Sequence, residues 1–231
     1  AATVSELLAT AIEKQAALST WVDERQTEIA TLAALPDLTD DMANLTAAAP
    51  GSAAARAAHD HLVRDLRAWV GPGRPFLAML ALDPDTGEVL AATHPDEEGK
   101  FKEDQPFFIN GKDGVFVQNL YYSTALQGPA MTAAAPLLAP DGRLLGVLAG
   151  RLKLDEMNAI IRRRTGLRQT DETYLVNTSN LFVTQPRFVS DQAVLQRGVH
   201  TPAVERCLAR DSGVVSALDY RGEQALIVYR W

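Results

Sequence analysis

Apolar residues recur at alternating steps of three and four through the first 35 residues. Positions 4, 8, 11, 15, 18, 22, 25, 29 and 32 follow this spacing, and seven of the nine are apolar, Gln15 and Arg25 being the exceptions. This is the pattern of one helix face, close to a coiled-coil seam. We predict one helix of roughly 50 Å that ends at Pro36. It either runs along both modules described below, pairs with a second copy, or packs on its own sheet.

The next segment predicts a second helix followed by an antiparallel sheet. Ser52 is a candidate N-cap after the Pro50-Gly51 turn, and Gly71 ends the apolar stripe of this helix. The apolar period then changes to that of strands, and two of the connections have hairpin-like turn residues. Helices packed on one face of such a sheet give an α+β module. The predicted strands are Phe76–Leu82, Gly87–Thr93, Val115–Tyr122, Met131–Leu138 and Arg143–Leu152.

A strand, a polar turn, a second strand and a proline follow one another twice, ending at Pro95 and again at Pro186. Fixed-order recurrence indicates a duplicated structural unit. The second, smaller unit is predicted to contain a helix that begins at Thr201-Pro202, and its sheet should continue with at least one strand beyond Trp231. Its predicted strands are Glu172–Val176, Leu181–Thr184, Val214–Tyr220 and Glu223–Tyr229. The predicted domains are a spine helix (1–36), a larger module (37–154), a connecting helix (155–165) that Gly166 stops, and a smaller module (166–231).

Charge and composition exclude several classes of function. A net charge of −7 argues against a nucleic-acid surface. The single cysteine, Cys207, excludes an internal disulfide and a cysteine-based zinc site. No run of about 18 apolar residues spans a membrane, and no signal peptide is visible.

No catalytic, metal or cofactor site stands out. The four histidines are scattered, and there is neither a nucleophile elbow nor a phosphate loop. The glycines of Gly146–Gly150 lie in a strand-like run, where they favour close strand packing over a phosphate cradle. Acidic pairs such as Asp96–Glu98 lie in a polar loop and are interpreted as solvated surface. We therefore predict no catalytic residues, no metal and no cofactor.

Three runs resemble, in order, the membrane-distal module of the double Cache family: DQPFF (Asp104–Phe108), YYS (Tyr121–Ser123) and APLLAPDGRLLGVLAGRL (Ala135–Leu152). The runs Gly166–Phe188 and Asp219–Trp231 resemble the membrane-proximal module. The family comprises PAS-like extracytoplasmic sensor domains of bacterial histidine kinases, chemoreceptors and diguanylate cyclases. The resemblance thus implies two PAS-like antiparallel-sheet modules, the proximal one smaller, alongside a long N-terminal helix.

The resemblance also implies a ligand pocket between the distal sheet and the crossing segment Gly99–Asn110. Gln105 stands where the family commonly has an arginine, and Arg151 stands where amino-acid-binding members have an aspartate. Both departures disfavour an amino acid and favour a small carboxylate or a neutral ligand, with a carboxylate gripped by Arg151. In the alternative, the aromatic residues are core and Arg151 is a surface residue near a strand end. The predicted ligand-binding residues are Lys100, Gln105, Phe107, Phe108, Tyr121, Tyr122 and Arg151.

The expected function is the small-molecule input domain of a bacterial transmembrane receptor, foremost a sensor histidine kinase of a two-component system. Such a domain is periplasmic, is tethered to the inner membrane through flanking segments, forms a weak homodimer in the intact receptor and is not itself an enzyme. Two alternatives remain open. One is a Cache-like structural or dimerisation module that binds no ligand, and the other is a soluble hydrolase on a PAS-like scaffold.

Overall fold

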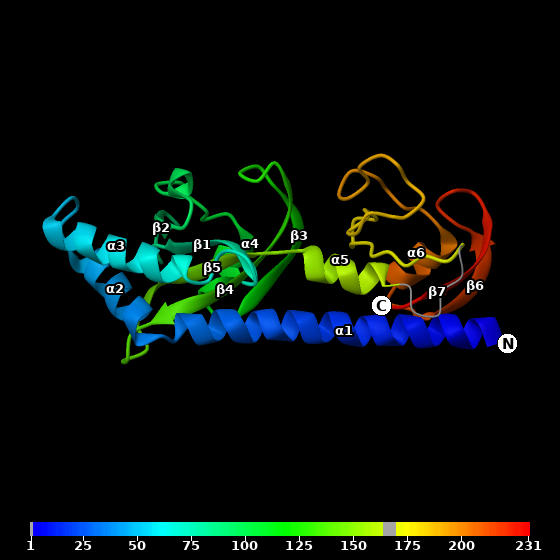
Figure 1. The fold of residues 1–231 in the computed structure, drawn as a ribbon, viewed down its shortest axis with the longest axis horizontal. Helices are drawn as coiled ribbons and strands as arrows, with labels where there is room; N and C mark the ends of the chain where they lie inside the picture. Colours follow the sequence, from blue (N-terminus) through cyan, green and yellow to red (C-terminus); the bar gives the residue numbers. More distant parts are fainter. Residues whose placement is uncertain (1, 164–169) are drawn as a thin grey trace. The chain divides into compact units, whose positions relative to one another are not determined.

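The computed structural model describes residues 2–163 and 170–231, which form two compact units (Figure 1). The five-stranded unit is Val22–Leu154, and the two-stranded unit is Ala1–Trp21 together with Asp155–Trp231. Helix α1 (Ala2–Ala33) is unbroken and contributes residues to both units. The fold is therefore mixed α+β, with a long N-terminal helix and two separate antiparallel sheets.

Pro36 ends α1, as predicted, but it also begins a helix that the sequence pattern did not indicate. Leu35 is extended, and Pro36 takes the first position of α2 (Pro36–Ala47), where its missing N–H costs nothing. The next helix, α3 (Ala53–Arg67), confirms the predicted cap, because the Ser52 hydroxyl accepts a hydrogen bond from the Ala55 amide at 3.1 Å.

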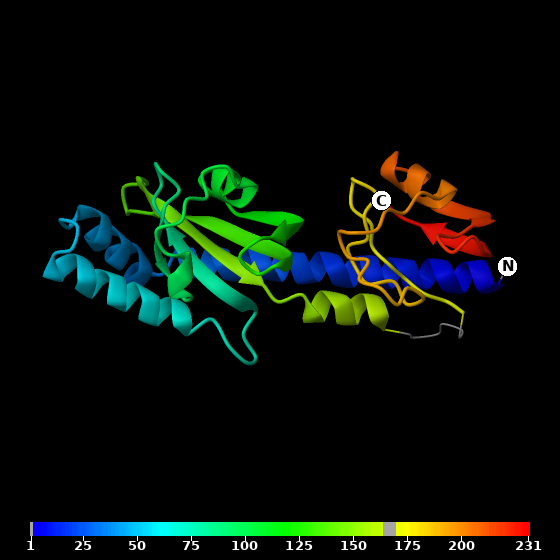
Figure 2. The ribbon, with the colours of Figure 1, turned by 90° about the horizontal axis from the view of Figure 1, so that it is seen from above.

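The larger sheet has the strand order β2-β1-β5-β4-β3, and its paired strands run antiparallel, side by side in Figure 2. All five strands were predicted, with ends within three residues of those observed. The strands are β1 (Phe76–Leu82), β2 (Val89–Ala92), β3 (Phe116–Ser123), β4 (Gly128–Leu138) and β5 (Leu144–Leu152).

The two faces of this sheet are covered by different elements. Gly146 of β5 faces Met42 of α2, whereas its neighbour Val147 faces Gly111 at the end of α4 (Pro106–Gly111). Successive residues of a strand point to opposite faces, so α2 and α4 lie on opposite sides of the sheet. The α4 face buries an apolar cluster: Leu80, Leu82, Val89, Ala92, Phe107, Phe108, Ala134, Val147 and Ala149.

Close packing explains the glycines of β5, as the sequence interpretation predicted. A Cβ on Gly146 would lie 2.4 Å from the Met42 methyl carbon and 2.7 Å from the Leu82 carbonyl oxygen, which belongs to the backbone and cannot swing away. We expect Gly146→Ala to lower the free energy of unfolding by about 1–3 kcal/mol through overpacking. Urea unfolding measures the difference against Gly114→Ala, whose Cβ meets nothing within 4 Å. Equal stability of the two variants would contradict the close packing.

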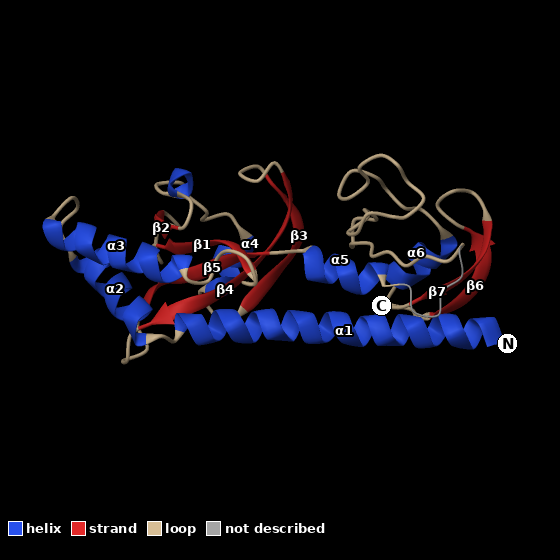
Figure 3. Ribbon diagram, in the orientation of Figure 1, coloured by secondary structure: helices blue, strands red, loops and turns tan. Residues whose placement is uncertain are grey.

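The two-stranded unit contains α5 (Asp155–Arg162), α6 (Pro202–Leu208), β6 (Gly213–Leu218) and β7 (Gln224–Tyr229), with β6 and β7 paired in a small sheet (Figure 3). The predicted strands over 172–184 are wrong, because this stretch forms only isolated bridges, Val176 with Phe182 and Leu181 with Gly198. The predicted Thr201 cap is confirmed by a bond from the Val204 amide at 3.3 Å. The predicted helix stop at Gly166 lies outside the described residues.

Aromatic rings replace a regular sheet as the core of that stretch. Tyr174, Phe182 and Tyr220 meet edge to face, with ring centroids 5.2–5.4 Å apart. The Tyr220 hydroxyl donates to the Glu172 carboxylate. Burial, helped by Glu172, raises the pKa of Tyr174 to about 12, and burial with the hydrogen bond to Glu172 also raises the pKa of Tyr220. Both phenols therefore stay protonated across the physiological range.

Candidate functional site

Three cations converge on one buried carboxylate in the five-stranded unit. Glu97 lies at the end of the 3-10 helix η1 (Pro95–Glu97) and is 1% exposed. One carboxylate oxygen accepts a hydrogen bond from Arg151 of β5 at 2.7 Å and lies 3.4 Å from the amino group of Lys102. The other accepts a hydrogen bond from Lys100 at 2.8 Å. We call Glu97, Lys100, Lys102 and Arg151 the Glu97 cluster.

The cluster has more positive than negative charge. Burial by itself raises the pKa of Glu97, but the hydrogen bonds from Lys100 and Arg151 and the charge of Lys102 lower it to about 2. Glu97 is therefore ionised at neutral pH, and three cations with one anion give the cluster a net charge of about +2. Arg151 is 5% exposed, so its charge is held inside the fold by this pairing.

Arg151 belongs to a row of polar side chains that crosses the sheet. It stands opposite Thr132 of β4, which stands opposite Gln118 of β3, so all three point to the α4 face. Thr132 is fully buried, and its hydroxyl is 2.8 Å from the Tyr121 hydroxyl. The Gln118 side-chain oxygen accepts a hydrogen bond from the Phe107 amide at 3.0 Å. Each of the three polar side chains thus has a hydrogen-bond partner within the fold, on an otherwise apolar face.

Three of the seven predicted ligand residues meet at this row. Lys100 and Arg151 share Glu97, and Tyr121 bonds to the residue opposite Arg151. Phe107 and Phe108 lie in the apolar core, 3% and 2% exposed. Whether any of them binds a ligand stays a prediction.

The other two predicted residues lie elsewhere. Tyr122 is 55% exposed, because strand alternation turns it away from the face that Tyr121 occupies. The Gln105 amide donates to its neighbour Asp104 at 2.9 Å, and Gln105 precedes α4 without capping it. The crossing segment Gly99–Asn110 is also not a simple loop, since α4 forms its second half.

Two interpretations from the sequence are wrong. The acidic pair Asp96–Glu98 was interpreted as solvated surface, yet Glu98 is half-buried against His59, and Glu97 between the two is buried. The alternative that placed Arg151 at the surface is also wrong, because Arg151 is buried. Sequence reasoning also missed Lys102, Thr132 and Gln118. The available signal was the polar positions in the alternating strands around Gln118 and Thr132, which interrupt an apolar face.

The residue after Glu97 faces the opposite way. Glu98 accepts hydrogen bonds from a ring nitrogen of His59 on α3, at 3.0 Å, and from the Ala92 amide, at 2.9 Å. These residues border an open groove of about 400 Å³ between α3 and the stretch 95–102, which we call the η1 segment. It is lined by His59, Asp60, Val63, Arg64, Arg67, Ala92, Pro95 and Glu98.

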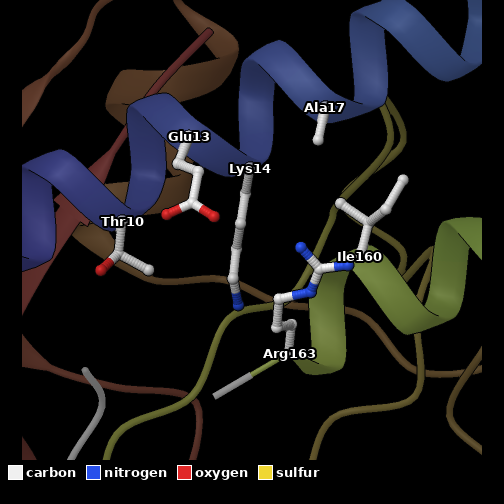
Figure 4. Close-up of a pocket in the computed structure, with 6 residues that line it drawn as sticks. All are labelled: Thr10, Glu13, Lys14, Ala17, Ile160 and Arg163. Carbon is white, nitrogen blue, oxygen red and sulfur yellow. The ribbon is translucent and has the colours of Figure 1, made fainter. Parts of the chain in front are cut away.

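A smaller cavity lies in the two-stranded unit, where α1 faces α5 (Figure 4). Lys14 is buried there, and its amino group donates to the Ile161 carbonyl at 2.5 Å and to the Thr173 hydroxyl at 2.9 Å. Burial lowers the pKa of Lys14. The cavity volume of about 20 Å³ holds little more than one water molecule, too little for a ligand. Lys14 instead caps the C-terminal end of α5, where a cation is favourable.

The described part of the chain shows neither a metal-binding cluster nor a membrane-spanning helix. Residues 2–163 and 170–231 contain no group of three or more His, Cys, Asp or Glu side chains placed to hold a metal ion. Over the same residues, no helix combines the length and hydrophobicity that a membrane span requires.

Comparisons with known proteins identify the fold. No protein-family model and no curated protein matches the sequence. Among solved structures, the sensor domain of the V. cholerae histidine kinase DctB superposes with a TM-score of 0.68 at 12% identity, over 98% of this chain and 90% of that one. The ligand-binding domain of the Campylobacter jejuni chemoreceptor Tlp3, in complex with 4-methylisoleucine, gives 0.59 at 15% identity, over 96% and 84%.

An extracellular ligand-binding receptor from Desulfohalobium retbaense gives a TM-score of 0.57 at 14% identity. The match covers 96% of this chain but only 36% of that receptor. The fold is thus that of the extracellular sensor domains of histidine kinases and chemoreceptors, as the resemblance to the Cache family predicts.

Proposed function

We propose that this chain is the extracytoplasmic sensing domain of a bacterial transmembrane receptor, foremost a sensor histidine kinase, and that it binds a small carboxylate. The five-stranded unit is the membrane-distal PAS-like module and the two-stranded unit the membrane-proximal one. The domain is periplasmic, is tethered to the inner membrane by segments outside this sequence, and dimerises weakly in the intact receptor. It senses rather than catalyses. The shared fold supports this class of function.

The observation that carries the ligand proposal is the Glu97 cluster. Its three cations surround a single carboxylate, so a second anion is attracted to it. A guanidinium can hold two carboxylates through different N–H groups, which suits Arg151 to this role. Thr132 and Tyr121 then provide hydroxyls beside Arg151 for the rest of the ligand.

One observation favours a second candidate, a Cache-like structural or dimerisation module that binds no ligand. Glu97 already gives Arg151 a charged partner within the described chain, so the pair could serve the fold alone. The two candidates differ in whether any acid stabilises the folded protein.

A thermal-shift screen with small mono- and dicarboxylates separates them. An acid that binds only the folded state adds to the free energy of unfolding, by about 2.7 kcal/mol at 100 times its Kd. The melting temperature therefore rises with the logarithm of the acid concentration. We expect at least one acid to do so in the wild type and to lose the effect in Arg151→Ala. Matched amides and alcohols of the same acids control for nonspecific effects. A screen in which no acid shifts the wild type would favour the structural module.

A further inference from the structure

Two adjacent glutamates fasten the η1 segment on opposite sides. Glu97 points inward to Arg151 of β5, and Glu98 points outward to His59 of α3. The segment therefore lies between α3 and the sheet, and both of its anchors include a titratable group. We propose that His59 is a positioning residue, a latch that holds the η1 segment closed over Arg151 more firmly in acid than in base.

The surroundings of His59 determine the sign of this effect. One ring nitrogen is 3.0 Å from Glu98 and the other 3.3 Å from Asp60. Arg64 and Arg67 line the same groove, but Arg64 pairs with Asp65 at 3.0 Å. The two carboxylates in direct contact thus dominate the field at the imidazole.

The protonation of His59 follows from these contacts. Partial burial lowers its pKa, but the hydrogen bonds and charges of Glu98 and Asp60 outweigh burial and raise the pKa above its ordinary value of 6.5. A group whose pKa is raised by folding stabilises the folded arrangement at low pH. That contribution is lost as the pH rises through the raised pKa. The latch is therefore an ion pair in acid and a neutral hydrogen bond in base.

The latch controls access to the cluster beneath it. Glu97 and Arg151 are 1% and 5% exposed, so no solute reaches Arg151 until the segment moves. Movement breaks the backbone bonds from Gly99 to Val89 and from Lys102 to Gly87, each 2.9 Å long. If the proposed acid binding holds, the apparent affinity scales with the open fraction. Ligand binding should then be weaker in acid for a reason unrelated to the ionisation of the ligand.

Hydrogen exchange of the Gly99 and Lys102 amides tests the latch in the whole protein without any ligand. After correction for the intrinsic rate, we expect their opening constant to rise about two- to five-fold from pH 5.5 to pH 8. This is the change in the opening equilibrium expected when a partly exposed ion pair is lost. In His59→Gln the opening constant should be raised at pH 5.5 and independent of pH. Glu98→Gln, which keeps an acceptor for the Ala92 amide, should behave in the same way.

Two histidines serve as matched controls. His61→Gln, next to the latch on α3, and His94→Gln, next to η1, should keep the wild-type pH dependence. Protection of the β4 and β5 amides verifies that each variant is folded. A wild-type opening constant that does not change with pH overturns the latch, and so does a dependence that survives in His59→Gln. Because exchange needs no acid, failure of the latch and failure of the carboxylate screen are separate results.

Discussion

We expect Glu97→Ala to lower the free energy of unfolding by about 3–5 kcal/mol, the usual cost of removing one member of a buried ion pair. The variant leaves the Arg151 guanidinium buried without its 2.7 Å partner, and Lys102 loses its nearby charge as well. Chemical unfolding at pH 7 measures the loss. Asp96→Ala is the matched control, since Asp96 is the exposed neighbour and should change stability by less than about 0.5 kcal/mol.

Two further measurements attribute the loss to the pair. Replacing both partners, Glu97→Leu with Arg151→Met, should recover most of the stability, because the buried guanidinium is then removed together with its partner. Acid should mimic Glu97→Ala in the wild type. The pKa of Glu97 is lowered from 4.5 to about 2, so its contribution is complete above pH 4.5 and lost as the pH falls toward 2. A Glu97→Ala variant as stable as Asp96→Ala would show that the cluster contributes nothing to the fold.

The elements that the sequence predicted are those specified by local pattern. The strands of the larger sheet are short, mostly apolar runs bounded by turn residues, and the Ser52 and Thr201 caps depend on residues three positions away. The long helix α1 was predicted from its spacing, although its buried side chains include Lys14 and Trp21, which the predicted seam omits. Burial on that helix depends on what each half packs against, which the spacing does not contain.

The errors arise where tertiary contacts override local signals. Pro36 was interpreted only as the end of a helix, although a proline is equally suited to begin the next one. The strand-like runs over 172–184 form isolated bridges and ring contacts instead of a strand ladder, because no long partner strand lies beside them among the described residues.

At the candidate site, too, local sequence pattern does not predict the decisive tertiary contact. Arg151 could be singled out because it replaces an acidic residue expected from the family resemblance. Its partner could not, since Glu97 lies 54 residues away and nothing in the run of three acidic residues distinguishes the buried one from its neighbours. The tertiary fold, in which β5 pairs with β1, places Arg151 next to Glu97, whereas Glu98 contacts His59.

We expect Arg151→Ala to weaken binding of the most stabilising acid from the screen by about 10- to 150-fold. A charge-assisted pair in a partly desolvated site is worth about 1.5–3 kcal/mol, and each 1.4 kcal/mol is a factor of ten in Kd. The variant should remain folded, because Lys100 and Lys102 still neutralise Glu97. Titration calorimetry measures the affinity, with Arg143→Ala, an exposed arginine near the start of β5, as the control that should bind as the wild type does.

Two conservative variants then define how Arg151 acts. Arg151→Lys should recover only part of the affinity, because a point charge cannot hold Glu97 and a ligand carboxylate with the geometry of a guanidinium. Glu97→Gln should bind the acid more tightly than the wild type, since it removes the internal carboxylate that competes for Arg151 while keeping nearly the same shape. An unchanged Kd in folded Arg151→Ala would place the ligand elsewhere, whereas weaker binding in Glu97→Gln would show that Glu97 helps to hold the ligand instead of competing with it.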